Sequence, residues 1–170
     1  MPITPRRLVA LAGPLALAAA LAAGAHAAVS VGAALPDATF RDLAGNAVRT
    51  ADLRGKPAVI AFWATWCTSC KAELDHLKAV RAAHPEAELR ILAVSVDEER
   101  ADLDDYLADH SFPFPVYHDP DRAAAAKFSD DEDLPLTVVA DAQGQVKYVS
   151  RDFVEGAAAR LDAAVSAVLP

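Results

Sequence analysis

The sequence predicts an α/β fold with a mixed central sheet and helices on both faces. Three observations lead to this prediction. Two apolar runs of strand length, PAVIAFWA (57–64) and LRILAVSV (89–96), are typical of strands buried on both faces. Segments with helical spacing of apolar residues follow both runs. A hairpin pattern and an Ala-rich helical segment close the chain, and strands that alternate with helices indicate layers packed on a sheet.

The expected elements can be placed in order along the chain. Two short strands surround a turn at Gly45-Asn46, and Thr50 is expected to cap the helical turn 51–53. Phe112 to Pro115 alternates Phe with Pro and therefore excludes a regular helix. The other predictions are a strand at 57–64, a helix at 67–83, a strand at 89–96, a helix at 99–110, a strand at 116–117, a helix at 123–128, a hairpin within 135–151 and a helix at 156–169.

The first 27 residues have the three-part plan of a secretory signal. Arg6 and Arg7 form a basic start, an apolar run extends to about residue 23, and Ala25-His26-Ala27 offers small residues for cleavage. An uncleaved anchor is the alternative, because about 20 apolar residues can cross a bilayer. The two arginines do not separate a Sec signal from a twin-arginine signal.

The chain then divides into a signal or anchor, 1–27, and one compact domain, 28–170. The net charge of −8 argues against binding to nucleic acid or to anionic lipid. We expect a periplasmic or otherwise exported protein, which contacts a membrane only if the first segment is retained. An exported dithiol tends to become a disulfide unless it is reduced by another protein.

The two cysteines, Cys67 and Cys70, are separated by two residues and are the only ones in the chain. Structural zinc usually needs four N or S ligands, and His76 and His84 are spaced too far apart for a typical second ligand pair. We therefore predict no metal. A structural staple is a poor explanation too, because closing a four-residue ring contributes only about 2 kcal/mol.

Redox exchange explains the cysteine pair better. Cys67 is expected where a buried strand meets a helix, and the free N–H groups of a helix N-terminus favour a thiolate. Cys70 follows one turn later, where it can attack a mixed disulfide formed at Cys67.

The segment FWATWCTSCKAEL (62–74) resembles the active site of exported thiol:disulfide oxidoreductases of the TlpA/ResA/DsbE-like family. Further resemblance lies in LPDATFRDLAGNAVRTADLRGK (35–56), LAVSVDEE (92–99), FPFPVYHDPD (112–121) and LPLTVVADAQGQV (134–146). The resemblance implies a thioredoxin-like fold with an N-terminal hairpin extension and a central insertion. It also implies a redox-active Cys67–Cys70 disulfide with no other cofactor.

The resemblance assigns Cys67 as the exposed nucleophile and Cys70 as the buried resolving cysteine. It implies a cis bond between Leu134 and Pro135, which exposes backbone groups to an extended substrate strand. Trp66 is expected beside the disulfide, where it shapes the docking surface with Leu134 and Pro135. For Trp63 we expect core packing only.

Glu73 matches a glutamate that this family carries three residues after the second cysteine. On a helix it lies on the same face as Cys70, and its implied role is to take and give the proton of Cys70. Thioredoxins themselves have a buried aspartate in the preceding strand, and the matching residue here is Ala61. A solvated helix glutamate is the simpler alternative.

The dipeptide between the cysteines departs from the family pattern, and a nearby acidic run opposes its expected effect. Thr68-Ser69 replaces a dipeptide that contains proline in most relatives, and its hydroxyl and N–H groups are able to stabilise a Cys67 thiolate. The acidic run SDDED (129–133) directly precedes the Leu134–Pro135 pair and would disfavour a nearby thiolate. The sequence does not rank these opposing effects, so the reduction potential stays open.

The leading hypothesis is an exported oxidoreductase that reduces protein disulfides, with cytochrome c maturation as one task known in the family. Its expected partners are protein thiol or disulfide substrates with basic faces, and an upstream membrane thiol reductase. A copper(I) metallochaperone on the same fold is the alternative, since soft thiolates suit that metal. A peroxidase fits poorly, because such sites have a proline and a threonine before the reactive cysteine.

Overall fold

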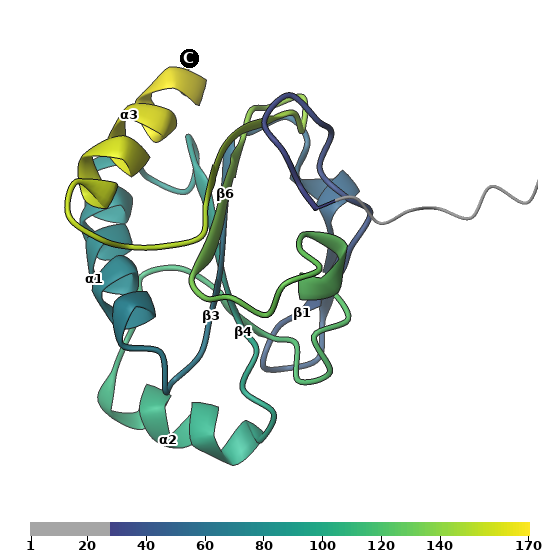
Figure 1. The fold of residues 1–170 in the computed structure, drawn as a ribbon, viewed down its shortest axis with the longest axis vertical. Helices are drawn as coiled ribbons and strands as arrows, with labels where there is room; N and C mark the ends of the chain where they lie inside the picture. The colour runs from purple at the N-terminus through teal and green to yellow at the C-terminus, as the bar shows by residue number, and fades with distance from the viewer. Residues whose placement is uncertain (1–27) are drawn as a thin grey trace, which may run out of the picture.

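The computed structural model describes residues 28–170, which surround one central sheet (Figure 1). The segment 1–27, predicted to be a signal or an anchor, lies outside the described residues. Within residues 28–170, no helix has both the length and the apolar character needed to cross a bilayer.

The central sheet has the strand order β5-β4-β3-β6-β7. β3, β4 and β5 are parallel to one another, whereas β6 is antiparallel to both β3 and β7. The strands are β3 (Ala58–Trp63), β4 (Arg90–Ser95), β5 (Val116–His118), β6 (Leu136–Ala140) and β7 (Val146–Ser150). The mixed central sheet predicted from the sequence is confirmed.

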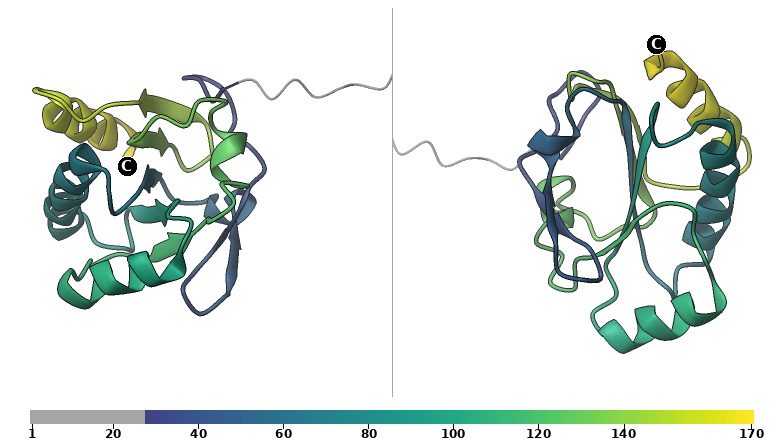
Figure 2. Two further views of the ribbon diagram at one scale, coloured as in Figure 1. Left: turned by 60° about the horizontal axis from the view of Figure 1, so that its bottom comes forward. Right: turned by 180° about the vertical axis from the view of Figure 1, so that it is seen from behind.

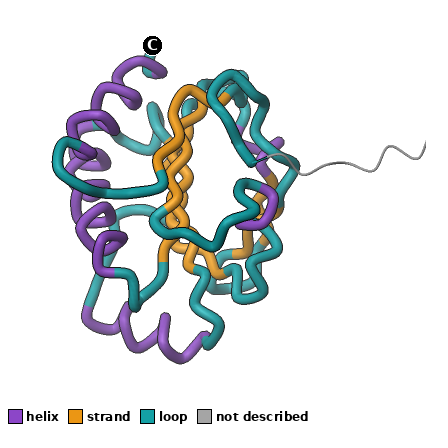
Figure 3. Tube along the Cα trace, viewed as in Figure 1, coloured by secondary structure: helices purple, strands orange, loops and turns teal. Residues whose placement is uncertain are grey.

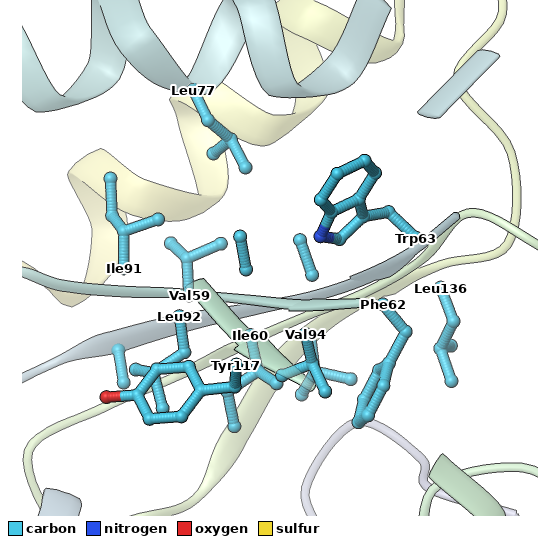
Figure 4. Packing of buried hydrophobic residues seen from close by; sticks show 14 of the residues in the cluster. Val59, Ile60, Phe62, Trp63, Leu77, Ile91, Leu92, Val94, Tyr117 and Leu136 are labelled. Atoms are coloured by element: carbon cyan, nitrogen blue, oxygen red, sulfur yellow. The ribbon is translucent and has the colours of Figure 1, made fainter. Parts of the chain in front are cut away.

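The middle strand β3 is apolar throughout, and all six of its residues are buried. Alternate side chains point to opposite faces of a strand. Figure 4 shows Trp63 and Leu77 on one side of the sheet and Phe62 on the other. The two runs of the sequence that lacked polar alternation are therefore apolar because both of their faces lie in the core.

Two helices, α1 (Thr68–Ala83) and α3 (Ala157–Val168), lie side by side on one face of the sheet (Figure 1; Figure 2). The opposite face is covered by the hairpin of β1 (Thr39–Arg41) and β2 (Ala47–Arg49) and by two 3-10 turns, η1 (Thr50–Leu53) and η2 (Ala125–Lys127). The short helical cover of this second face is visible in Figure 3. The third helix, α2 (Arg100–Asp109), lies at the end of the sheet where α1 begins.

Some local predictions need correction. Thr50 begins η1 and does not cap it: its hydroxyl donates to the carbonyl of Pro36 (2.7 Å) and accepts the N–H of Ala38 (3.2 Å). These bonds tie η1 to the segment before β1. The helix expected at 123–128 is the single 3-10 turn η2.

The long helix α1 is limited at both ends by local chemistry. Cys67 is its N-cap, in extended conformation, and the buried residues Leu74, Leu77 and Val80 face the sheet. The helix ends at Ala83, and His84 is extended, as expected for a residue that precedes a proline. The cysteine pair is consequently fixed at the first turn of a helix that packs on the sheet.

Candidate active site

The cysteine pair lies on the connection between β3 and α1. The N–H of Cys67 donates to the carbonyl of Ala64 (3.1 Å), which closes a tight turn after β3. Cys67 and Cys70 form a disulfide, and the N–H of Cys70 donates to Sγ of Cys67 (3.2 Å). The first sulfur therefore occupies the N-cap position, where free helix N–H groups and the helix dipole stabilise negative charge.

The two sulfur-bearing residues differ in their access to solvent. Cys67 keeps an exposed fraction of 7%, and Cys70 has none. Trp66, directly before them, is 68% exposed, whereas Trp63 is fully buried, as expected. A partner can thus approach the disulfide only from the side of Cys67 and Trp66.

The Thr68-Ser69 dipeptide contributes one hydroxyl to the site. Oγ of Ser69 lies 3.6 Å from Sγ of Cys67, near enough for a weak hydrogen bond to sulfur. Together with the N–H of Cys70, it gives Cys67 two polar neighbours that would stabilise a thiolate.

A cis peptide bond joins Leu134 and Pro135, as the resemblance implied. β6 begins at the next residue, Leu136, which pairs with Phe62 near the end of β3. The cis bond therefore lies at the same edge of the sheet as the turn that leads to Cys67. Pro135 is buried, and Leu134 is half-buried.

Glu73 lies on the face of α1 that packs against the sheet, one turn after Cys70. Its side chain is 1% exposed, so the simpler interpretation as a solvated helix glutamate is wrong. Oε1 accepts a hydrogen bond from Oγ1 of Thr137 (2.7 Å). Oε2 is buried and has no hydrogen-bond partner among the described residues.

This environment raises the pKa of Glu73 to about 7. Burial is the main cause because it removes water from the charged form, and the carboxylate of Asp152 adds to the effect. The hydrogen bond from Thr137 acts in the opposite direction and lowers the pKa. A carboxyl with this pKa can accept and release a proton near neutral pH.

The small side chain of Ala61 explains how the Glu73 carboxyl fits between α1 and the sheet. In the antiparallel pairing of β3 and β6, Ala61 lies directly opposite Thr137, so both side chains point to the same face. Thr137 binds Glu73, so this is the face covered by α1. The small side chain of Ala61 leaves room there, and the carboxyl comes from the helix instead of from the strand.

A second buried carboxylate, Asp97, follows β4 and holds the turn before the cysteines. It accepts the N–H of Thr65 (3.0 and 3.1 Å), the hydroxyl of Thr65 (2.8 Å) and the hydroxyl of Ser95 (2.8 Å). The side chain of Asp97 is 2% exposed, and its backbone carbonyl lies 2.7 Å from Nε2 of His118. Asp97 therefore fixes the backbone between Trp63 and Cys67.

Sequence reasoning missed both Thr137 and Asp97 as parts of the site. Each carries a recognisable signal. Thr137 is the one polar residue within the buried strand β6. Asp97 comes two residues after the end of the buried parallel strand β4, at the edge where the cysteine turn also lies. A polar side chain placed where an apolar one is expected needs a partner, and here each partner belongs to the site.

Part of the acidic run 129–133 lies close to Trp66. Glu132 joins Glu98, Glu99 and Asp102 around a cavity of about 320 Å³ that Trp66 also lines. Arg122 contributes the one basic side chain to this lining, and it donates to the carbonyl of Glu132 (3.1 Å).

Two histidines of the described residues have partners other than the cysteine pair. Nε2 of His76 lies 2.8 Å from Oδ1 of Asp162 on α3, and His118 contacts the carbonyl of Asp97. Across residues 28–170, no three side chains of His, Cys, Asp or Glu are grouped so that they could hold a metal ion.

Comparison with known proteins agrees with this geometry. Residues 31–149 match the AhpC/TSA family. The chain belongs to that family. It is also 30% identical over 122 residues to the thiol-disulfide oxidoreductase ResA of Geobacillus kaustophilus, covering 72% of this chain and 70% of the relative.

Solved structures of related proteins share the fold. A structure from Chlorobium tepidum, described as a thiol:disulfide interchange protein DsbE, has a TM-score of 0.76 and 22% identity, over 83% of this chain and 99% of its own. A secreted disulfide oxidoreductase from Mycobacterium tuberculosis, homologous to DsbE of E. coli, has a TM-score of 0.65 and 25% identity, over 76% and 94%. The thioredoxin-like fold is confirmed, and this member of the AhpC/TSA family is a thiol:disulfide oxidoreductase.

Proposed function

We propose that this oxidoreductase is exported and reduces disulfides of partner proteins through Cys67 and Cys70. One observation carries the proposal: the disulfide lies at a helix N-terminus, only its Cys67 half keeps any exposed area, and a buried carboxyl lies one turn beyond Cys70. The secreted relative from Mycobacterium tuberculosis supports export. Cytochrome c maturation is one task that fits such a reductant.

The first step is attack by the Cys67 thiolate on a disulfide of the partner. A new S–S bond joins Cys67 to one partner sulfur, and the other partner sulfur leaves as a thiolate that takes up a proton. The N–H of Cys70 and the hydroxyl of Ser69 lie beside Sγ of Cys67 and stabilise the attacking anion. Trp66 and the Leu134–Pro135 pair frame the approach of the partner chain.

The second step releases the partner. Glu73, in its ionised form, takes the proton of the Cys70 thiol, and Cys70 attacks Sγ of Cys67. The bond between Cys67 and the partner breaks, and the second partner sulfur leaves as a thiolate that is then protonated. Two electrons have passed from the dithiol to the partner, and the Cys67–Cys70 disulfide remains. An upstream thiol reductase returns it to the dithiol by the reverse steps.

The test is a trap for partner proteins. Replacing Cys70 by Ala removes the sulfur that releases the partner, so mixed disulfides at Cys67 should accumulate in the exported compartment. Mass spectrometry of the trapped species then identifies the partners. The matched control is the double variant Cys67→Ala, Cys70→Ala, which should trap none. If the Cys70→Ala variant captures no more partner than this control, the exchange function is wrong.

The direction of exchange is tested by redox equilibrium. A reductant should have a reduction potential below that of its compartment, and equilibration with a glutathione buffer measures it. A potential well above about −200 mV would instead make the protein an oxidant.

The charge around Trp66 supports partners with basic faces. Four exposed acidic residues, in addition to the buried Asp97, line the cavity beside this exposed ring, and opposite charges accelerate encounter. Reduction of a lysine-rich disulfide peptide should slow with increasing salt. At low salt, Glu132→Gln should reduce kcat/KM about twofold, and Asp105→Asn, at an exposed site on α2, should not. A rate that is independent of salt would show that these acidic residues do not attract the partner electrostatically.

A further inference from the structure

Thr137 lies in the middle of the sheet and has no role in the steps above. Its side chain is fully buried, and it pairs with Ala61 on β3 and with Ser150 on β7. Strand pairing on both sides fixes its backbone, and branching at Cβ restricts its side-chain rotamers. The hydroxyl of Thr137 is therefore held in a defined direction, toward α1.

The hydroxyl donates to Oε1 of Glu73 at 2.7 Å, and it is the only hydrogen-bond donor that the described residues offer to this carboxyl. Oε2 is equally buried but has no partner. A buried polar atom without a partner is rare and calls for an explanation. The two oxygens of one carboxyl are thus in different environments.

We infer that Thr137 is a positioning residue: it holds Oε1 of Glu73 and leaves Oε2 as the atom that exchanges a proton with Cys70. The inference rests on the proposed role of Glu73 in the second step. The hydroxyl stabilises the ionised carboxyl, which is the form that accepts the proton. Without this hydroxyl, the carboxyl remains protonated up to a higher pH and no longer has a fixed orientation.

Among the described residues, no other group near Glu73 donates a hydrogen bond to its carboxyl, so Thr137 alone controls its hydrogen bonding. β3 and β6 contribute only neutral side chains, and the one charged residue of β4, Arg90, lies at the far end of that strand, opposite Ala58. Asp152, after β7, opposes ionisation of Glu73. On the next turn of α1, His76 is paired with Asp162 of α3.

The direct test is titration of the Glu73 carboxyl in the disulfide form, in which the cysteines do not titrate. Carbon-13 NMR of the carboxyl should show its midpoint near the pKa of about 7. In Thr137→Val, which keeps the shape but lacks the hydroxyl, the midpoint should rise by about one pH unit. Thr137→Ser restores a hydroxyl and should return the midpoint toward that of the parent protein.

A second readout follows the chemistry. Reaction of the dithiol form with an aromatic disulfide releases one chromophore when Cys67 attacks and a second when Cys70 displaces the first product. The rate of the second phase should increase with pH as Glu73 ionises. Thr137→Val should move this increase upward by about one pH unit, which slows the phase about tenfold below the midpoint. The first phase should keep its rate.

Two controls separate the outcomes. Thr39→Val, at an exposed position of β1, makes the same substitution away from the site and should change neither measurement. Thr137→Ala serves for the titration if the valine variant does not fold. Unchanged titration of Glu73 in Thr137→Val or Thr137→Ala would overturn the inference about Thr137 while leaving the role of Glu73 intact. An unchanged pH dependence of the second phase in Glu73→Gln would instead overturn the role of Glu73 itself.

Discussion

Two carboxylates, Asp97 and Glu73, are buried near the same edge of the sheet, and their surroundings are opposite. Asp97 accepts hydrogen bonds from three donor groups, the N–H and hydroxyl of Thr65 and the hydroxyl of Ser95, which use both of its oxygens. Glu73 accepts one, and its second oxygen has no partner. Burial alone therefore does not decide what an acid does. Asp97, with many donors, holds a backbone turn, whereas Glu73, with one donor, has the raised pKa that suits the proton carrier proposed above.

The same comparison separates the two halves of the disulfide. Asp97 acts on the side of Cys67, where it holds the turn that presents the nucleophile. Glu73 acts on the side of Cys70, which is fully buried and must lose a proton to react. In the proposed mechanism, position is thus supplied to one cysteine, and proton transfer to the other.

The largest effect should come from removing the side chain of Asp97, which holds the turn before Cys67. Asp97→Ala leaves the N–H and hydroxyl of Thr65 and the hydroxyl of Ser95 without their acceptor. We expect the disulfide form to lose about 3 kcal/mol in free energy of unfolding, measured by urea denaturation. Asp105→Ala, on the exposed side of α2, is the matched control and should cost little. Equal losses in the two variants would contradict the role of Asp97 in holding this turn.

The next effect depends on pH and concerns Glu73. Its pKa is about 7 in the folded protein, against 4.5 for an ordinary glutamate. Folding therefore favours the protonated form, so the stabilising contribution is complete below about pH 4.5 and is lost as the pH rises through about 7. Across this window the parent protein should lose about 3 kcal/mol relative to Glu73→Gln, which does not titrate.

Urea denaturation of both disulfide forms at a series of pH values checks this prediction. Glu88→Gln, at an exposed position, should follow the parent curve. A difference between parent and Glu73→Gln that stays constant with pH would show that Glu73 is not a raised-pKa acid, and the contrast with Asp97 would disappear.

The smallest effect should come from removing one donor of several. Ser95→Ala deletes one hydrogen bond to the carboxylate of Asp97, while Thr65 still provides two donors, and it also removes the acceptor of the Asp97 N–H (3.1 Å). We expect a loss of about 1 kcal/mol in free energy of unfolding. The loss should be the same at pH 5 and pH 8, and Ser166→Ala, at an exposed position of α3, should show none. A loss as large as that of Asp97→Ala would mean that the role of Asp97 depends on its hydrogen bond with Ser95 alone.

Much of the fold followed from the sequence because the signals were local. The apolar runs of β3 and β4 predicted buried strands, and the periodicity of Leu74, Leu77 and Val80 predicted α1. Short elements were less well predicted. Thr50 has the side chain of a helix cap, yet its hydroxyl binds Pro36 and Ala38, which only the folded chain brings near.

The sequence by itself determined the chemistry available: two cysteines at the first turn of a helix, a glutamate one turn later, and an alanine in place of the strand aspartate. Only the tertiary structure decided how that chemistry is controlled. Thr137 is 64 residues from Glu73, and Asp97 is 32 residues from Thr65. Their hydrogen bonds exist because strand pairing brings distant residues to one edge of the sheet. A residue's spacing along the chain defines its face on a helix or strand, but its partners across the sheet depend on the register of the whole fold.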